Sequence, residues 1–309
     1  MTAPDFSFVG YQPMTSVHTR AAQVFEGALR AELGDDLEFT LQNNVAEAGM
    51  KAADCLSLVE GGERTFCYFA SSYSAHRFAE IAILDLPFLV SDRVQAYRAL
   101  DGDFGDALKQ IVRSSSDYEL LGFWDNGFRH LSNGVHPIRT PGDCAGLTIR
   151  TGDSKLHQDT FAALGFEPTF IDVADLAAAV ERGDVEAQDN PLSNIFNFGI
   201  HNHHRHITLS GHFLGFVTVL CHRPTYEGWG ADTQTAVHKA VAQATEAQRG
   251  FAQAEDDRVL AELAKTDNEV VELTDGERRA FLAAVQPVID AQLASLDSGL
   301  VDLYLGTSA

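Results

Sequence analysis

The stretch that decides the fold runs from Gly146 to Leu192 and reads GLTIRTGDSKLHQDTFAALGFEPTFIDVADLAAAVERGDVEAQDNPL. Three short segments rich in strand-forming residues predict strands at 146–150, 168–171 and 185–188. Between them lie two segments with apolar residues at helical spacing, each begun by an aspartate cap and closed by a glycine: Asp153 to Gly165 and Asp172 to Gly183. This alternation predicts an α/β fold with a mainly parallel sheet.

The first seventy residues follow the same alternation. Strands are expected near residues 6–8, 37–41 and 65–70, where aromatic and aliphatic side chains concentrate. Thr15 or Ser16 can cap the first helix, and a second helix at 52–59 ends before two glycines. This βαβ pattern also predicts a mainly parallel sheet that is covered by helices.

The last third is helical. Residues 229–264 predict one helix that is long for a globular protein, and 272–296 predict another, begun at Thr274. No Pro- or Ser-rich linker separates the parts of the chain. We therefore expect two lobes that share strands and helices rather than two independent domains.

The charge balance excludes some partners. The 309 residues carry 22 Lys plus Arg against 44 Asp plus Glu, a formal net charge of −22. Nucleic acid and anionic membrane surfaces both require a basic face, so neither is expected as a partner. An anionic small molecule is not excluded, because a few arginines focused in a cleft can hold it.

Compartment and cysteine chemistry follow from the same inspection. No segment approaches the length of an apolar membrane span, and Met1–Gly10 lacks the features of a signal peptide. We expect either a cytosolic protein or the mature form of an exported one. Cys55, Cys67, Cys144 and Cys221 form no C-x-x-C pair and are expected to be buried free thiols, with a Cys55–Cys67 bridge as the alternative.

Enzyme motifs are absent: the sequence contains no nucleophile elbow, dinucleotide-binding glycine pattern, Walker loop or H-E-x-x-H. The histidine-rich segment His201–His206 raises the question of a metal site. Its spacing fits no common zinc pattern, and successive residues of an extended loop point apart. A polar surface loop is therefore the favoured interpretation, and no metal or cofactor is predicted.

Three polar residues stand where a ligand would be expected. Arg150 lies at the carboxyl end of a predicted parallel strand, where open α/β sheets place ligands, and its guanidinium can hold a carboxylate with two hydrogen bonds. The alternative is a surface ion pair with Asp153. Asn190 ends another strand, with helix capping as its alternative, and Arg129 is the third candidate.

Five segments, in this order and spacing, resemble the solute-binding proteins of TRAP transporters, of the DctP type. They are residues 83–89 (ILDLPFL), 121–130 (LGFWDNGFRH), 137–150 (PIRTPGDCAGLTIR), 185–192 (VEAQDNPL) and 209–215 (LSGHFLG). The resemblance implies a two-lobed, periplasmic-binding-protein-like (Venus flytrap) α/β fold with a long helix spanning both lobes. Lobe I would comprise residues 1–123 and 211–250, and lobe II residues 124–210 and 251–309.

The resemblance also implies site residues. Arg150 would pair with the carboxylate of an organic acid in the cleft between the lobes, and Arg129 and Asn190 would add hydrogen bonds. The wall of the site would come from Gln12, Ser71, Tyr73, Trp124, Phe170, His212 and Phe213. A buried carboxylate needs such paired charge and satisfied lone pairs, and closure would be a hinge motion selected by the ligand.

A receptor of this kind is not an enzyme. It would act as a periplasmic monomer that delivers a small organic acid, such as a sugar acid, to membrane permease subunits. The alternatives are an enzyme or sensor of the same fold, or a metal-dependent receptor that uses the histidine cluster. Two departures from the family pattern are Ala187 in place of the usual glycine and the segment Asn43–Lys51.

Overall fold

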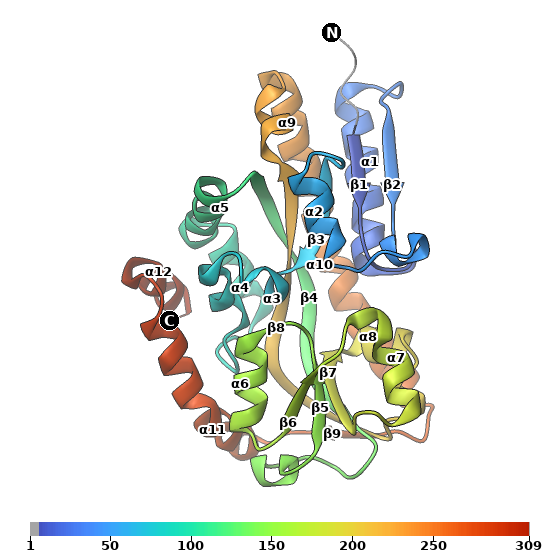
Figure 1. Cartoon of the computed structure of the whole chain (residues 1–309), viewed down its shortest axis with the longest axis vertical. Helices are drawn as coiled ribbons and strands as arrows, with labels where there is room; N and C mark the ends of the chain where they lie inside the picture. The colour runs from blue at the N-terminus through green and yellow to red at the C-terminus, as the bar shows by residue number, and fades with distance from the viewer. Residues whose placement is uncertain (1–5, 309) are drawn as a thin grey trace. The chain divides into compact units, whose positions relative to one another are not determined.

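The computed structural model describes residues 6–308, which form two compact units (Figure 1). The first unit comprises residues up to Ala70, Leu100–Asp125 and Phe216–Gln253. The second comprises Ser71–Ala99, Asn126–Gly215 and the residues from Ala254 onward.

The first unit is built on strands β1 (Phe6–Val9), β2 (Phe39–Gln42) and β3 (Phe66–Ala70) and the carboxyl-terminal part of β8 (His206–His222). Their order is β2-β1-β3-β8, with β1 parallel to β2 and β3, and β3 antiparallel to β8. The predicted strands near 6–8, 37–41 and 65–70 are therefore confirmed.

The helices and helical turns of the first unit are α1 (Val17–Leu33), η1 (Val45–Ala48), α2 (Asp54–Glu60), α5 (Asp103–Ser115), α9 (Arg223–Gly228) and the start of α10 (Ala231–Leu263). The Ser16 hydroxyl caps α1 by accepting from the Thr19 amide, as one of the two expected caps. Figure 1 shows α1 beside β1 and β2.

An aromatic core fills the first unit. Phe8, Phe66, Tyr68 and Trp124 are buried in it with the apolar face of α1. A Cβ at Gly10 would lie 2.6 Å from the Tyr68 ring, so only glycine lets β1 pass this ring so closely.

The second unit contains the stretch that decides the fold. Strands β5 (Thr148–Thr151), β6 (Glu167–Phe170) and β7 (Ala187–Pro191) pair in parallel with β5 between the other two, and β7 pairs antiparallel with β4 (Tyr118–Asn133). One more strand of this unit, β9 (Glu269–Glu272), runs parallel to the start of β8 and was not expected from the sequence. The sheet is thus mixed but mainly parallel.

The helices of the second unit are α3 (Ser71–Ser74), η2 (Ala79–Asp85), α4 (Arg93–Leu100), η3 (Pro141–Cys144), α6 (Lys155–Ala163), α7 (Val173–Arg182), α8 (Leu192–Asn197), η4 (Ile200–Asn202), α11 (Asp275–Ala294) and α12 (Ser298–Ser308). In Figure 1, α6 and α7 lie on opposite sides of the strands β5 to β7. Asp172 caps α7 as predicted, but the cap of α6 is Ser154 rather than Asp153. Asp153 instead lies 3.4 Å from His76.

Two strands and one helix continue from one unit into the other. β4 has 16 residues and β8 has 17, and Gly122, Gly127, Gly211 and Gly215 lie within them without ending them. The helix α10, with 33 residues, confirms the long helix expected at 229–264.

The compact units differ from the predicted lobes mainly at residues 71–99. These residues were assigned with lobe I, yet they pack within the second unit, where α3 and η2 contact each other and η2 contacts α6. The Ser71 hydroxyl bonds to Asp85 inside this segment. The chain thus enters the second unit directly after β3.

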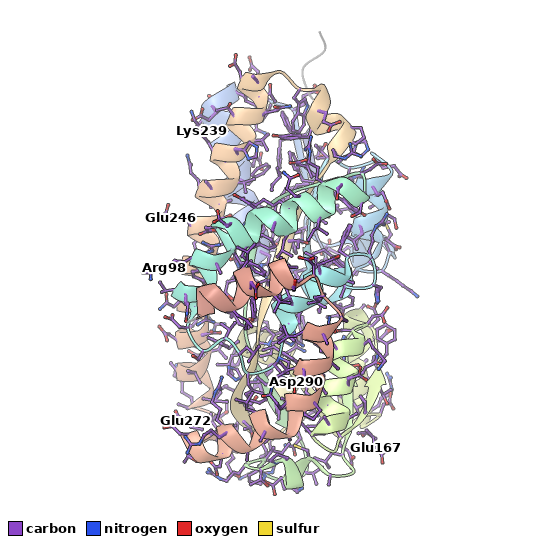
Figure 2. The ribbon with its side chains drawn as sticks, turned by 90° about the vertical axis from the view of Figure 1, so that its left-hand side faces the viewer. Arg98, Glu167, Lys239, Glu246, Glu272 and Asp290 are labelled. Carbon is purple, nitrogen blue, oxygen red and sulfur yellow. The ribbon has the colours of Figure 1, made fainter. Side chains whose placement is uncertain are left out.

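All four cysteines are free and buried, as predicted, and no Cys55–Cys67 bridge forms. Within residues 6–308, no helix is both long enough and apolar enough to cross a membrane. Most acidic and basic side chains lie outside the core, and Figure 2 labels six exposed ones: Arg98, Glu167, Lys239, Glu246, Glu272 and Asp290. The buried exceptions are Asp85, Asp125, Arg129, Arg150 and Asp189. The surplus of acidic residues thus belongs largely to the surface of the protein.

Candidate functional site

Arg150 has a buried guanidinium that forms no ion pair with any residue from 6 to 308. It is 2% exposed and stands on β5 opposite Gln188 of β7, and its Nε donates to the Ile171 carbonyl at 2.7 Å. Its Nη2 is buried without a hydrogen-bond partner. The predicted alternative, an ion pair with Asp153, is wrong. A buried charge without a partner lowers the stability of the folded protein unless an anion binds to it.

Arg129, the second predicted arginine, is already paired. Its Nε donates to Asp189 Oδ2 at 2.5 Å and its Nη2 to the Asp189 carbonyl at 2.8 Å. Burial by itself would lower the pKa of Arg129, but the adjacent Asp189 carboxylate raises it overall. The same pairing holds the pKa of Asp189 well below its usual range, although burial alone would raise it. Asp189 was not predicted as a site residue, and the sequence signal for it was its position between Gln188 and Asn190.

His212 completes this group from β8. Its Nε2 lies 3.3 Å from Asp189 Oδ2, and its Nδ1 lies 2.7 Å from the Ser210 hydroxyl. Burial lowers the pKa of His212 although Asp189 favours its protonated form. The neutral imidazole therefore donates through Nε2 to the carboxylate and accepts at Nδ1 from the serine.

Asn190 lies in a buried hydrogen-bond chain rather than at a helix cap. Its Nδ2 donates to Gln188 Oε1 at 2.6 Å, and its Oδ1 accepts from Asn194 at 3.3 Å. Gln188 in turn donates to the Ser132 hydroxyl, which lies 3.0 Å from His204 Nδ1. α8 begins after Pro191 without a side-chain cap, so the capping alternative is wrong. The amide of Asn190 keeps one donor for another partner.

Ser71 and Phe213 meet around His157 of α6, a residue that the sequence analysis did not select. The His157 ring stacks on Phe213 with centroids 4.2 Å apart, and its Nε2 lies 3.5 Å from Asp85 Oδ1 without hydrogen-bond geometry. Asp85 Oδ2 accepts from the Ser71 hydroxyl at 3.2 Å. The structure thus brings two predicted wall residues together through an unexpected buried histidine and aspartate.

Two further wall residues lie near the ends of β5 and β6. Tyr73 covers Gly152, where a Cβ would lie 3.0 Å from the tyrosine hydroxyl. Phe170 ends β6, next to Thr151 in the register, and remains 49% exposed. An aromatic ring this exposed at a strand end is available to a ligand.

Gln12 and Trp124, the remaining predicted wall residues, belong to the first unit. Trp124 is fully buried, stacks on Phe8 and donates its indole N–H to Thr245 at 3.2 Å. Gln12 is buried, and its carbonyl accepts from the side chain of Asn43.

Further buried polar atoms in the second unit lack hydrogen-bond partners. The hydroxyls of Ser74, Thr151 and Thr160 are in this state, together with Asp189 Oδ1 and His157 Nε2. Native interiors rarely leave such groups unmatched, and a polar ligand or bound water is the usual explanation. Sequence reasoning missed these residues because threonine and serine carry no motif of their own.

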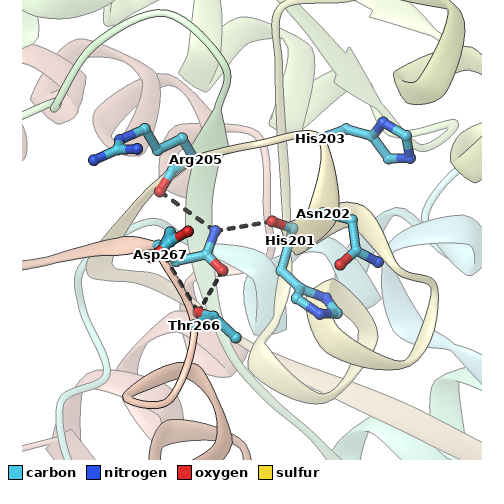
Figure 3. Close-up of a pocket in the computed structure, with 7 residues that line it drawn as sticks. His201, Asn202, His203, Arg205, Thr266 and Asp267 are labelled. Carbon is cyan, nitrogen blue, oxygen red and sulfur yellow. Dashed lines mark hydrogen bonds between the residues drawn. The ribbon is translucent and has the colours of Figure 1, made fainter.

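The histidine-rich loop forms a separate pocket of about 330 Å³ (Figure 3). At its centre Asn268 donates to the carbonyls of His201 and His204, which fixes the loop. Figure 3 shows the rings of His201 and His203 apart from one another. In the part of the chain that the structure describes, no three His, Cys, Asp or Glu side chains gather to hold a metal ion.

Comparison with known proteins agrees with the resemblance noted in the sequence. The family model of bacterial extracellular solute-binding proteins, family 7 (DctP), matches residues 8–296. The 2,3-diketo-L-gulonate-binding periplasmic protein YiaO of Escherichia coli is 26% identical over 86% of this chain and 79% of its own length. The C4-dicarboxylate-binding periplasmic protein DctP of Rhodobacter capsulatus is 30% identical over 68% of this chain, and the match spans 63% of that relative.

The fold agrees with a solved member. The sugar acid binding protein DctPAm of Advenella mimigardefordensis, in complex with galactonate, superposes with a TM-score of 0.93. The match covers 99% of this chain and 98% of that chain at 22% identity. Because the family model matches residues 8–296, nearly the whole length of the chain, the chain belongs to the DctP family of bacterial extracellular solute-binding proteins.

Proposed function

We propose that this protein is a receptor that binds a small organic acid, with the carboxylate on Arg150 and a polyhydroxylated sugar monoacid as the ligand class. Its relatives are named for 2,3-diketo-L-gulonate and C4-dicarboxylates, and the structural neighbour holds galactonate. All these ligands share a carboxylate. We therefore assign the shared carboxylate to Arg150 and infer the rest of the ligand from the other polar residues of the site.

Arg150 is the observation that carries the proposal. Its guanidinium is 2% exposed, and among residues 6–308 its Nη2 has no hydrogen-bond partner and its positive charge has no counter-ion. A ligand carboxylate would supply both the missing charge and the missing acceptor. A planar guanidinium suits a planar carboxylate, since two parallel N–H bonds can form.

The charge balance of the site favours one carboxylate over two. Arg129 is neutralised by Asp189, and His212 is neutral, so neither offers a free positive charge to a second carboxylate. The unmatched hydroxyls of Ser74, Thr151 and Thr160 instead suit ligand hydroxyls, which both donate and accept. These features support a sugar monoacid rather than a dicarboxylate.

The transport role completes the proposal. The two compact units would be the lobes that close around the acid, in the place of the lobes predicted from the sequence. The protein would work in the periplasm as a monomer, without catalysis or cofactor, and deliver its ligand to the membrane permease subunits of a TRAP transporter. Light scattering tests the monomer, and recovery of unchanged ligand from the purified protein tests the absence of turnover.

A ligand panel tests the central claim. Thermal shift followed by calorimetry would compare sugar monoacids, including D-galactonate and D-glucuronate, with succinate and malate, because ligands that bind only the folded state raise its stability. We expect the monoacids to stabilise the protein and the dicarboxylates to do so far less. Arg150→Lys should weaken binding about tenfold or more, because lysine lacks the planar guanidinium that forms two parallel hydrogen bonds. The matched control Arg182→Ala, at an exposed arginine of the same unit, should leave affinity unchanged.

Two results would overturn this proposal. Tighter binding of a dicarboxylate than of any monoacid would remove the ligand class. Unaltered affinity of Arg150→Lys for the bound acid would remove Arg150 from the site.

A further inference from the structure

Two backbone positions with a positive φ lie beside His212 in the second unit: Gly211, where glycine adopts it freely, and Phe88, where it is strained. Gly211 has φ = 52°, which bends β8 between Ser210 and His212. Phe88 has φ = 60°, and it is the non-glycine residue with a positive φ in the described part of the chain. Strain of this kind persists only where surrounding contacts hold it, and it concentrates at functional sites.

Three groups from different elements hold the bend. The Phe88 amide donates to the His212 carbonyl at 2.7 Å. The Gly211 amide donates to His130 Nδ1 at 3.1 Å. Arg278 of α11 donates through Nη1 to the Ser210 carbonyl at 2.8 Å and through Nη2 to the Gly211 carbonyl at 3.3 Å. These four hydrogen bonds are all donated by N–H groups. Together they hold the backbone around Gly211 in one conformation.

The guanidinium of Arg278 is used for these two backbone hydrogen bonds. Its guanidinium carbon lies 5.3 Å from the centroid of the Phe88 ring, and within residues 6–308 it forms no ion pair with an acid. Arginine serves this position because its two terminal nitrogens reach two successive carbonyls while its plane faces an aromatic ring. Neighbouring Arg279 is exposed and provides no such bond.

The bend determines where His212 points. With Ser210 and Gly211 fixed, the Ser210 hydroxyl reaches His212 Nδ1, and His212 Nε2 reaches Asp189. Asp189 in turn holds Arg129. A contact on α11 is therefore linked by consecutive bonds to an arginine of the candidate site.

We propose that Arg278 is a positioning residue of the ligand site, which fixes the β8 bend so that His212 orients Asp189 and Arg129. The inference rests on the proposed function for its effect on affinity, but not for its effect on His212. A small hollow of about 190 Å³, lined by Phe88, Asp275, Arg278, Arg279 and Leu282, lies beside the guanidinium. Water can fill the space of a shortened side chain there, so the variants should fold.

The experiment combines a ligand-free and a ligand-dependent measurement. Protein labelled with ¹⁵N-histidine reports the tautomer of His212 without ligand, and calorimetry reports affinity for D-galactonate. In Arg278→Ala we expect the His212 signals to lose the single Nε2–H tautomer and the affinity to fall about tenfold. Arg278→Lys keeps one carbonyl bond and should fall between, whereas Arg279→Ala should match the wild type in both measurements.

A double-mutant cycle shows whether the effect passes through His212. In the His212→Asn background, Arg278→Ala should reduce affinity by less than about twofold, because the intermediate is gone. An equal loss in both backgrounds, or His212 signals in Arg278→Ala identical to the wild type, would overturn the inference. A wild-type protein that binds none of the acids instead overturns the proposed function, so the two failures are told apart.

Discussion

Around Trp124 in the first unit, buried polar groups find partners within the protein. The indole bonds to Thr245, and Gln248 bonds both the amide and the carbonyl of Asp125. Around Arg150 in the second unit, the guanidinium, Thr151 and Asp189 each keep a buried atom without a partner. Both regions contain residues that the sequence predicted as ligand contacts, but three residues that each keep an unmatched buried atom lie together in the second.

This difference in unmatched polar atoms distinguishes a binding surface from a packed core. Burial is similar in both regions, since Trp124 and Arg150 are both almost fully buried, so burial by itself does not identify a site. Unmatched hydrogen-bonding capacity does, because a folded chain loses free energy for each buried polar atom that it leaves unpaired. The comparison predicts that substitutions near Trp124 change stability, while those near Arg150 change binding.

Removing the Trp124 side chain tests the first half of the comparison. Trp124→Ala should lower the free energy of unfolding by about 3–5 kcal/mol, because it empties a packed aromatic core. Chemical denaturation measures this change, and Trp229→Ala, at a partly buried ring of the same cluster, should cost less. Calorimetry at a temperature where the variant is folded should give wild-type ligand affinity. A stable variant that no longer binds ligand would make Trp124 a wall residue after all.

Replacing the charge of Arg150 tests the second half. Arg150→Met replaces the guanidinium by an apolar side chain of similar length. Because the positive charge is lost, ligand affinity should fall by about two to three orders of magnitude, or about 3–4 kcal/mol. The unliganded protein should become more stable, because an unpaired buried charge is removed. Thermal unfolding with and without ligand measures both effects. A loss of stability in the unliganded variant would show that Arg150 is a structural residue like those of the first unit.

Acid should weaken the second unit through its buried imidazoles. Burial lowers the pKa of His204 to about 4 and that of His130 to about 3, so the folded state keeps both neutral. The unfolded chain takes up protons near pH 6.5, so stability is complete above that pH and is lost as the pH falls toward the folded pKa. For His204 the loss between pH 6.5 and 4 is roughly 3 kcal/mol.

Denaturation curves across this pH range check the expectation. His204→Gln should flatten the dependence of the free energy of unfolding on pH, because it removes the imidazole whose pKa burial lowers. An unchanged slope in His204→Gln would mean that His204 is protonated in the folded protein.

The sequence predicted the elements of the fold well where local signals decide them. Caps such as Ser16, Asp172 and Thr274, and glycine closures such as Gly183, lie where expected, because capping depends on neighbouring residues alone. The length of β4 and β8 and the existence of β9 were missed. Those features depend on pairing with distant strands, which leaves no local pattern in the chain.

The candidate site was predictable only in part. Arg150 could be placed at a strand end from the order of strands and helices, and the resemblance selected it. That Arg129 is neutralised by Asp189, and that His157 stacks on Phe213, depends on contacts between residues far apart in sequence. The unmatched hydroxyls could not be foreseen, because whether a threonine is satisfied is a property of its neighbours in space.

A matched pair of threonines makes the smallest and most direct test of the comparison. Thr19 in the first unit is fully buried, and its hydroxyl contacts the Ser16 hydroxyl at 3.0 Å and the Gln12 carbonyl at 3.4 Å. Thr151 in the second unit is equally buried, but its hydroxyl has no partner. Valine has nearly the same shape as threonine, so Thr→Val at each position removes the hydroxyl and little else.

The two substitutions should act in opposite directions. Thr19→Val should lower the free energy of unfolding by about 1 kcal/mol, because it removes satisfied bonds. Thr151→Val should raise it by about 1 kcal/mol without ligand, since an unsatisfied buried hydroxyl is lost, while affinity for a sugar acid falls about fivefold. Chemical denaturation and calorimetry of both variants supply the four values. Equal destabilisation by both would mean that Thr151 is satisfied within the protein, and the contrast between the two units would then rest on Arg150 and Asp189 alone.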